Sequence, residues 1–152
     1  MKKKTALLFF VLFLLVCGCK KQSPTESSLK ANATIAEAKA FWESKRITNY
    51  ILEQTIQSWY PWDDSVRIII VADTINSIVS VKTGISLDRD SWGRYKTVRQ
   101  LFEIAEYDTS VYFINYELDT KYGYPRVLFF AVKPFPRTEG GIKIVTYSFT
   151  RK

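Results

Sequence analysis

The chain has 152 residues with 22 basic and 15 acidic side chains, a net charge of +7 at pH 7, no histidine, and two cysteines, Cys17 and Cys19. The lack of histidine excludes Ser-His-Asp and Cys-His nucleophile arrangements, imidazole general bases and histidine-dependent zinc sites. We therefore expect a domain that is not an enzyme and that needs neither a cofactor nor a metal.

The first eighteen residues have the three parts of a secretory signal peptide. Lys2, Lys3 and Lys4 precede an apolar run of eleven residues, Ala6 to Val16, which leads into Val16-Cys17-Gly18-Cys19. As a helix this run spans about 16 Å, well short of the roughly 30 Å hydrocarbon core of a bilayer. We predict that residues 1–18 are a signal peptide removed by cleavage.

The cysteine after the predicted cleavage site decides how the mature protein is located. Its setting resembles the pattern read by lipoprotein-processing enzymes, which implies that acyl chains such as palmitate are attached to Cys19. Such chains anchor a protein durably at a membrane, so we expect a cell-envelope lipoprotein outside the cytoplasm, in the periplasm of a two-membrane cell. Lys20 differs from the Asp that resembles an inner-membrane retention signal, which favours the outer membrane. The alternative is a secreted protein with a free thiol.

Residues 20–33 are polar and contain Ser, Pro and Lys without a hydrophobic period, a composition typical of a flexible tether. Residues 34–152 then form a single domain. Once the signal is removed, nineteen basic and fifteen acidic side chains leave a mature charge of +4. This charge is mild and scattered, so we expect no nucleic acid among the partners.

The predicted domain opens on a helix. Thr34 and Glu37 form a capping box, and apolar residues at helical spacing predict a helix from residue 35 to about 45. Alternating apolar and β-branched residues then predict strands over 49–59, 65–72 and 77–82.

The second half repeats this order. Residues 84–95 are polar and predicted to be irregular, and Thr97 with Gln100 forms a second capping box that opens a helix over 98–107. Three more alternating segments predict strands over 110–118, 126–132 and 142–149. The order α-β-β-β-α-β-β-β predicts an α+β fold in which an antiparallel sheet packs against two helices. It leaves open whether the two halves are a duplication.

Residues 40–150 resemble an uncharacterised bacterial lipoprotein family, the domain of unknown function 6174. The likeness rests on Trp42 before Ile47-Thr48-Asn49-Tyr50, on Val66-Arg67-Ile68, on Thr97 to Phe102 and, most specifically, on Tyr122-Gly123-Tyr124-Pro125-Arg126. The family prefers Gly where this chain has Thr74, so we expect a wider hairpin after Asp73. The resemblance implies a fold and an exported location. The architecture also looks similar to β-lactamase-inhibitor-like and small envelope-assembly modules, which bind proteins.

Two aromatic turns hold the candidate binding residues. Trp59, Tyr60 and Trp62 lie in a loop between predicted strands, where aromatic rings make good anchors for a partner or a glycan. Tyr122 and Tyr124 flank a glycine before a proline, a turn that can present two phenols. The alternative for each is structural, with rings folded over the core edge or fixed by turn chemistry.

We predict a lipid-anchored, non-catalytic module that binds an envelope protein or polymer. One alternative is an enzyme that uses carboxylates on a glycan, which requires two Asp or Glu side chains roughly 5 to 10 Å apart across a cleft. Another is a carrier of an apolar ligand, which requires an enclosed apolar cavity between helix and sheet. Neither the partner nor the oligomeric state follows from the sequence.

Overall fold

A computed structural model describes residues 27–58, 65–107, 111–132 and 141–152. Two α-helices and a short 3-10 helix, η1, accompany six strands: α1 (Ile35–Ser44), β1 (Tyr50–Gln57), β2 (Val66–Val71), β3 (Thr74–Ser80), η1 (Arg89–Arg94), α2 (Val98–Tyr107), β4 (Val111–Leu118), β5 (Pro125–Val132) and β6 (Ile142–Arg151). The strands form one sheet in the order β3-β2-β1-β6-β5-β4, and each neighbouring pair is antiparallel. The predicted α+β fold and its element order are confirmed.

The strand order bears on the repeated α-β-β-β pattern. The first strand of the first half, β1, pairs with β6 in the middle of the sheet, whereas the first strand of the second half, β4, lies at an edge. Across the sheet each half nevertheless reads in the same order, from its third strand to its first. The strand order therefore agrees with a duplication, which stays a prediction, and the connection from β3 to β4 runs from one sheet edge to the other.

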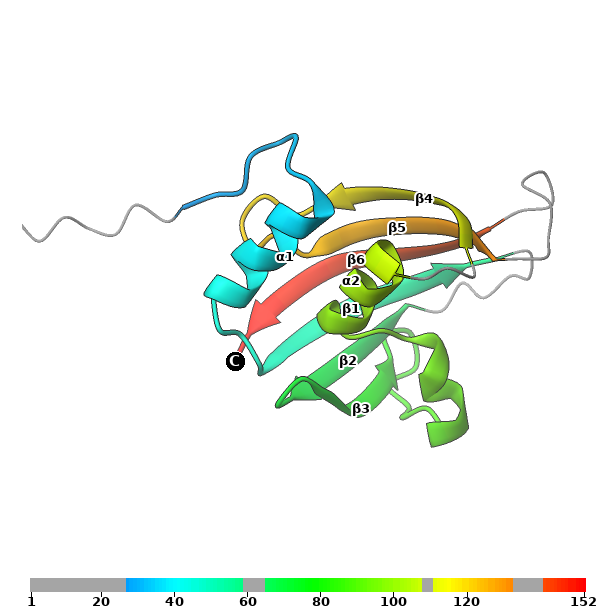
Figure 1. The fold of residues 1–152 in the computed structure, drawn as a ribbon. Coiled ribbons are helices and arrows are strands. Elements are labelled where there is room, and N and C mark those ends of the chain that lie inside the picture. Colours follow the sequence, from blue (N-terminus) through cyan, green and yellow to red (C-terminus); the bar gives the residue numbers. More distant parts are fainter. Residues whose placement is uncertain (1–26, 59–64, 108–110, 133–140) are drawn as a thin grey trace, which may run out of the picture.

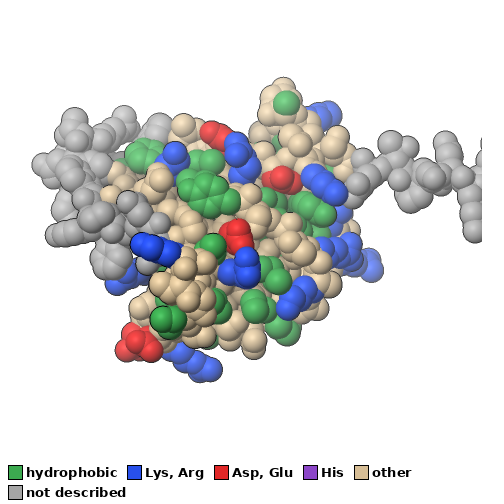
Figure 2. All heavy atoms as spheres, turned by 180° about the vertical axis from the view of Figure 1, so that it is seen from behind, with side chains coloured by type: hydrophobic (Ala, Val, Ile, Leu, Met, Phe, Trp, Pro, Cys, Tyr) green, Lys and Arg blue, Asp and Glu red, His purple; other side chains and the backbone are tan. Residues whose placement is uncertain are grey.

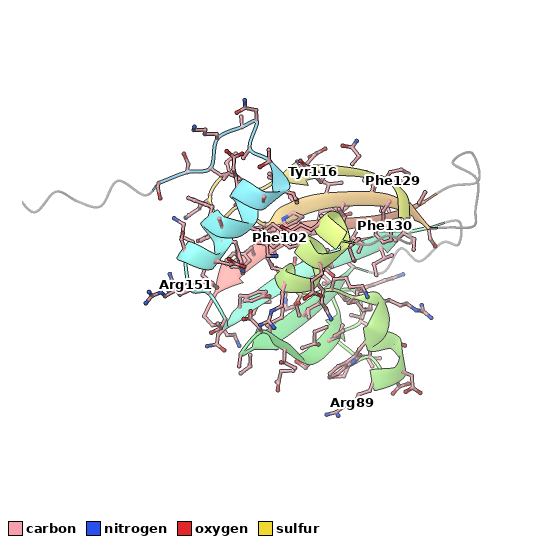
Figure 3. The ribbon with its side chains drawn as sticks, viewed as in Figure 1. Arg89, Phe102, Tyr116, Phe129, Phe130 and Arg151 are labelled. Atoms are coloured by element: carbon pink, nitrogen blue, oxygen red, sulfur yellow. The ribbon has the colours of Figure 1, made fainter. Side chains whose placement is uncertain are left out.

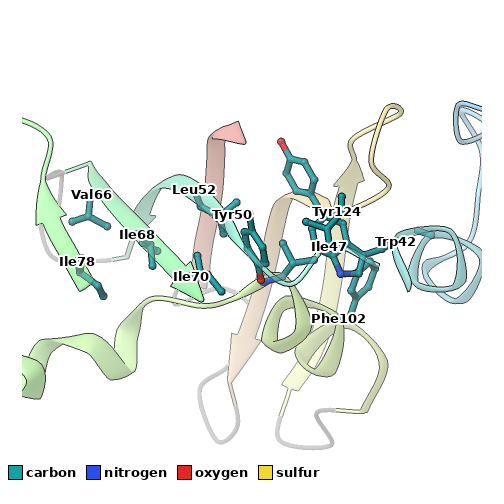
Figure 4. Close-up of a cluster of buried hydrophobic side chains, with 12 residues drawn as sticks. Trp42, Ile47, Tyr50, Leu52, Val66, Ile68, Ile70, Ile78, Phe102 and Tyr124 are labelled. Carbon is teal, nitrogen blue, oxygen red and sulfur yellow. The ribbon is translucent and has the colours of Figure 1, made fainter. Parts of the chain in front are cut away.

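Both α-helices lie on the same face of the sheet (Figure 1). The capping box predicted at the start of α1 is present, because the Thr34 hydroxyl accepts a hydrogen bond from the Glu37 N–H and the Glu37 carboxylate accepts one from the Thr34 N–H. Beneath the helices, the core draws on α1, α2 and the helix-facing side of β1, β2 and β3 (Figure 4). Its fully buried members include Tyr50, Leu52, Ile68, Ile70 and Ile78.

The hairpin between β2 and β3 is tighter than predicted. Val71 pairs with Thr74, so Ala72 and Asp73 alone form the turn, with φ values of 48° and 58°. Two positive φ angles define the type I′ turn that suits the twist of a hairpin. The wider turn expected from Thr74 is wrong, because Thr74 is the first residue of β3. The 84–95 segment, predicted to be irregular, contains η1.

The end of the predicted tether packs on the domain. The Leu29 N–H donates to the Thr120 carbonyl at 2.7 Å, and the Leu29 side chain packs against the core. The Lys45 ammonium donates to the Ser27 carbonyl at 3.3 Å. Among the described residues, contacts with the domain are therefore present from Ser27 onward, seven residues before the predicted boundary at Thr34. Within the described ranges, no helix has the length and apolar character needed to cross a membrane.

The Ala72-Asp73 turn yields a prediction about stability. Ala72 carries a Cβ at a φ of 48°, a conformation that costs an L-residue roughly 1 kcal/mol and costs glycine little. We expect Ala72→Gly to raise the free energy of unfolding by about 0.5–1 kcal/mol in urea titrations. Ala40→Gly, on the exposed side of α1, is the matched control and should lower it by about 1 kcal/mol. Equal losses in both variants would refute the strained turn.

Candidate functional site

A groove lies between α1 and α2, bounded by the α1–β1 connection and the β2–β3 turn. Its volume is about 420 Å³, within the range of about 300–1,000 Å³ that is common for ligand sites. Three apolar side chains line it: Trp42, Ile47 and Phe102. The charged side chains that line it are Lys39, Glu43, Arg46, Asp73, Arg99 and Glu103.

The apolar lining is rigid because it belongs to the core. Phe102 is 1% exposed and Trp42 is 6% exposed. The Trp42 ring meets the rings of Tyr50 and Phe149 edge to face, each with centroids 5.5 Å apart, a geometry that stabilises aromatic pairs. The groove therefore has a fixed apolar floor.

Two ion pairs connect the groove's walls. The Lys39 ammonium on α1 lies 2.6 Å from the Glu106 carboxylate on α2, and the Arg99 guanidinium on α2 lies 3.0 Å from the Asp73 carboxylate in the hairpin turn. These pairs tie the three walls of the groove to one another.

Three further charged side chains line the groove but do not take part in these ion pairs. Glu43, Arg46 and Glu103 are exposed, and none of them forms an ion pair with another residue that the structure describes. They offer one cationic and two anionic groups to a ligand. Arg46 also has a φ of 50° just after α1, a position that usually holds glycine or asparagine.

The α2 wall is held by side chains of β1. The buried Gln54 amide pairs with the Lys96 backbone: its Nε2 donates to the Lys96 carbonyl at 2.8 Å, and its Oε1 accepts from the Lys96 N–H at 3.1 Å. The Tyr50 hydroxyl accepts from the Val98 N–H at 3.1 Å. The predicted Thr97–Gln100 capping box is present as well. Together these bonds satisfy backbone N–H groups that a helix start leaves unpaired.

The Tyr122–Tyr124 turn serves the core. The Tyr124 ring is 4% exposed, and the rings of Tyr122 and Tyr124 lie 4.6 and 5.3 Å from that of Phe149. Between them, Gly123 has a φ of 85°, and a Cβ there would lie 2.9 Å from the Phe41 ring. This packing favours the structural interpretation of the turn, and a binding role for either phenol stays a prediction that the geometry does not support.

The remaining predicted site residues, Cys19, Trp59, Tyr60 and Trp62, lie outside the described residues, so their roles also stay predictions. Sequence reasoning missed Glu43, Arg46 and Glu103. Glu43 and Glu103 were marked only by their place on the polar sides of two predicted helices, and Arg46 only by its place just after the first, which are positions that most solvated charges share. No three His, Cys, Asp or Glu side chains group as metal ligands within the part of the chain that is described.

The chain belongs to the family of unknown function DUF6174, whose model matches residues 34–134. This confirms the resemblance to that domain family over residues 34–134. No curated protein and no solved structure matches the chain.

The buried phenols make stability sensitive to alkaline pH. Burial raises the pKa of Tyr50 to about 12, against the opposing effect of the Val98 N–H, and burial likewise raises the pKa of Tyr124 to about 12. The unfolded chain ionises both near pH 10 while the folded chain keeps both protons. The stabilisation that the two neutral phenols add to the free energy of unfolding is therefore complete below pH 10 and is lost between pH 10 and 12.

We expect the free energy of unfolding of the wild type to fall more than that of Tyr50→Phe between pH 9 and pH 11, by about 1 kcal/mol. The comparison of the two proteins removes the effect on the free energy of unfolding of other groups that titrate in this pH range. Urea titrations at both pH values measure the difference, and parallel losses in the two proteins would contradict it.

Proposed function

We propose that this member of the DUF6174 family is a cell-envelope lipoprotein, anchored by acyl chains on Cys19, whose domain is a non-catalytic module that binds a partner in the α1–α2 groove. The partner is an envelope protein or polymer that offers an extended segment with charges of both signs.

The unpaired charges of the groove carry this proposal. Glu43, Arg46 and Glu103 line an apolar floor of fixed shape, and fixed charges of both signs select a partner by electrostatic complementarity. An apolar ligand would leave these charges desolvated without partners, which is costly. A peptide segment satisfies both the floor and the charges.

A carboxylate-dependent enzyme acting on a glycan is the second candidate, because Glu43 and Glu103 come from facing helices onto one groove. The chain offers no imidazole to help them. The double variant Glu43→Gln, Glu103→Gln distinguishes the two functions. Glycan cleavage would stop with loss of the carboxylates, whereas binding of a peptide segment would weaken only by the lost charge interactions.

The anchor is supported by the order of residues at the start of the chain. A basic segment, an apolar run too short to span a bilayer and a cysteine after Gly18 stand in the order of a lipoprotein signal. Two or three acyl chains on one cysteine make attachment effectively permanent. We place the domain outside the cytoplasm, on the outer membrane in a two-membrane cell.

Crosslinking in intact cells tests the groove. A photoreactive amino acid at Glu103, which is exposed on α2, should give a discrete adduct with one partner, and Glu43→Lys in the same chain should reduce that adduct at least severalfold. The same probe at Lys82, exposed beyond β3, is the control. Identical adducts from both positions, or an adduct insensitive to Glu43→Lys, would count against the groove.

Mass spectrometry of the purified mature protein tests the anchor. We expect an N-terminal peptide that begins at Cys19 and carries acyl chains, and we expect Cys19→Ser to release the protein from the membrane fraction. An unmodified thiol on Cys19 would overturn the anchor and leave the groove proposal standing.

A further inference from the structure

One end of the sheet carries a group of basic side chains, here called the basic end: Lys30, Lys45, Arg46, Lys121, Arg151 and Lys152. Lys45 and Arg46 follow α1, and Lys121 lies in the β4–β5 turn. Arg151 ends β6, opposite the first residue of β1. Lys30 belongs to the segment that leads into α1.

The contacts of these residues place them together. Lys45 reaches Ser27 and lies over the Phe41 ring, and Phe41 lies against Gly123 of the β4–β5 turn. The Lys152 N–H donates to the Asn49 carbonyl at 3.1 Å. Figure 3 shows Arg151 beside the end of α1 and far from Arg89 on η1.

The basic end differs from the rest of the surface in its balance of charge. Within the described residues, the acidic side chains near these six are Glu37, Glu43, Asp73 and Asp119. Glu37 accepts hydrogen bonds from Thr34, and Asp73 is paired with Arg99. Asp119 is occupied, because its carboxylate accepts from the N–H groups of Lys121 and Tyr122. On the sheet face away from the helices, by contrast, Arg67 pairs with Glu53 and Arg126 with Glu117. Figure 2 shows Lys and Arg side chains gathered at the side where the described chain begins.

We propose that the basic end is the membrane-facing surface of the domain and docks on anionic lipid headgroups. This rests on the proposed anchor at Cys19. Eight peptide units separate Cys19 from Ser27, so even a fully extended chain holds this end within about 28 Å of the acyl chains. Attraction to anionic headgroups acts within about a Debye length, roughly 8 Å at physiological salt. The anchor brings the basic end close, and the headgroups then fix its orientation.

This orientation has a geometric consequence for the strands. β1 starts at the basic end and β6 finishes there, so the strands stand away from the bilayer. β1 has eight residues and spans about 26 Å. Gln57, the last residue of β1, and Val66, the first residue of β2, therefore lie at the far end.

Sedimentation with vesicles tests the surface without relying on acylation. The mature chain carrying Cys19→Ser is mixed with vesicles of phosphatidylcholine, with or without phosphatidylglycerol. We expect binding to the anionic vesicles only. Lys30→Gln, Arg151→Gln and Lys152→Gln together should lower the partition coefficient about a hundredfold, from roughly fivefold per basic side chain. Lys82→Gln, Arg89→Gln and Lys143→Gln, equally exposed and elsewhere, should change it no more than a few-fold.

Equal losses in the two triple variants, or failure of the parent chain to bind the anionic vesicles, would overturn the membrane-facing surface. An unacylated Cys19 in cells would overturn the anchor instead and would leave this result unchanged.

The orientation of the domain relative to the bilayer is measured in the acylated protein, in which an introduced cysteine is the only thiol. A fluorophore on Thr120→Cys, in the β4–β5 turn, should be quenched by nitroxide-labelled lipid, and one on Gln57→Cys should not. Equal quenching at both positions would contradict the proposed orientation.

Discussion

The paired hydrogen bonds between the Gln54 amide and the Lys96 backbone are the constraint on which the groove depends. Gln54 is fully buried in β1, where an unpaired amide is costly, and Lys96 satisfies both its donor and its acceptor. This bond fixes the chain just before α2, so the helix must start above β1. Tyr50, four residues before Gln54 on β1, caps the start of α2, because its hydroxyl accepts a hydrogen bond from the Val98 N–H. These contacts fix the position of the α2 wall of the groove, and the Lys39–Glu106 ion pair connects that wall to α1.

Local signals in the sequence predicted most of the fold. Both capping boxes, both helices and six strands follow from patterns that span a few residues, and the structure confirms them. The turn after β2 was mispredicted because Thr74 was expected to lie in it, whereas Ala72 and Asp73 have the two positive φ angles and Thr74 begins β3. The Gln54–Lys96 pair joins residues 42 apart, and no short-range pattern encodes such a contact. The groove was missed for the same reason: its walls meet only after the sheet has formed.

The groove and the basic end are neighbouring surfaces of the domain. Arg46 belongs to both, since it follows α1 and lines the groove. A domain standing on its basic end would hold the groove beside the bilayer, where it would meet partners at the same membrane.

The most direct test of the central constraint is amide hydrogen exchange at Lys96 and Val98, combined with urea unfolding, in the wild type and in Gln54→Leu. Leucine keeps much of the volume but leaves the Lys96 N–H and carbonyl without their buried partner. We expect a loss of roughly 2–5 kcal/mol in the free energy of unfolding and faster exchange at Lys96 and Val98 than the global loss of stability explains. A nearly unchanged free energy with both amides still protected would contradict it.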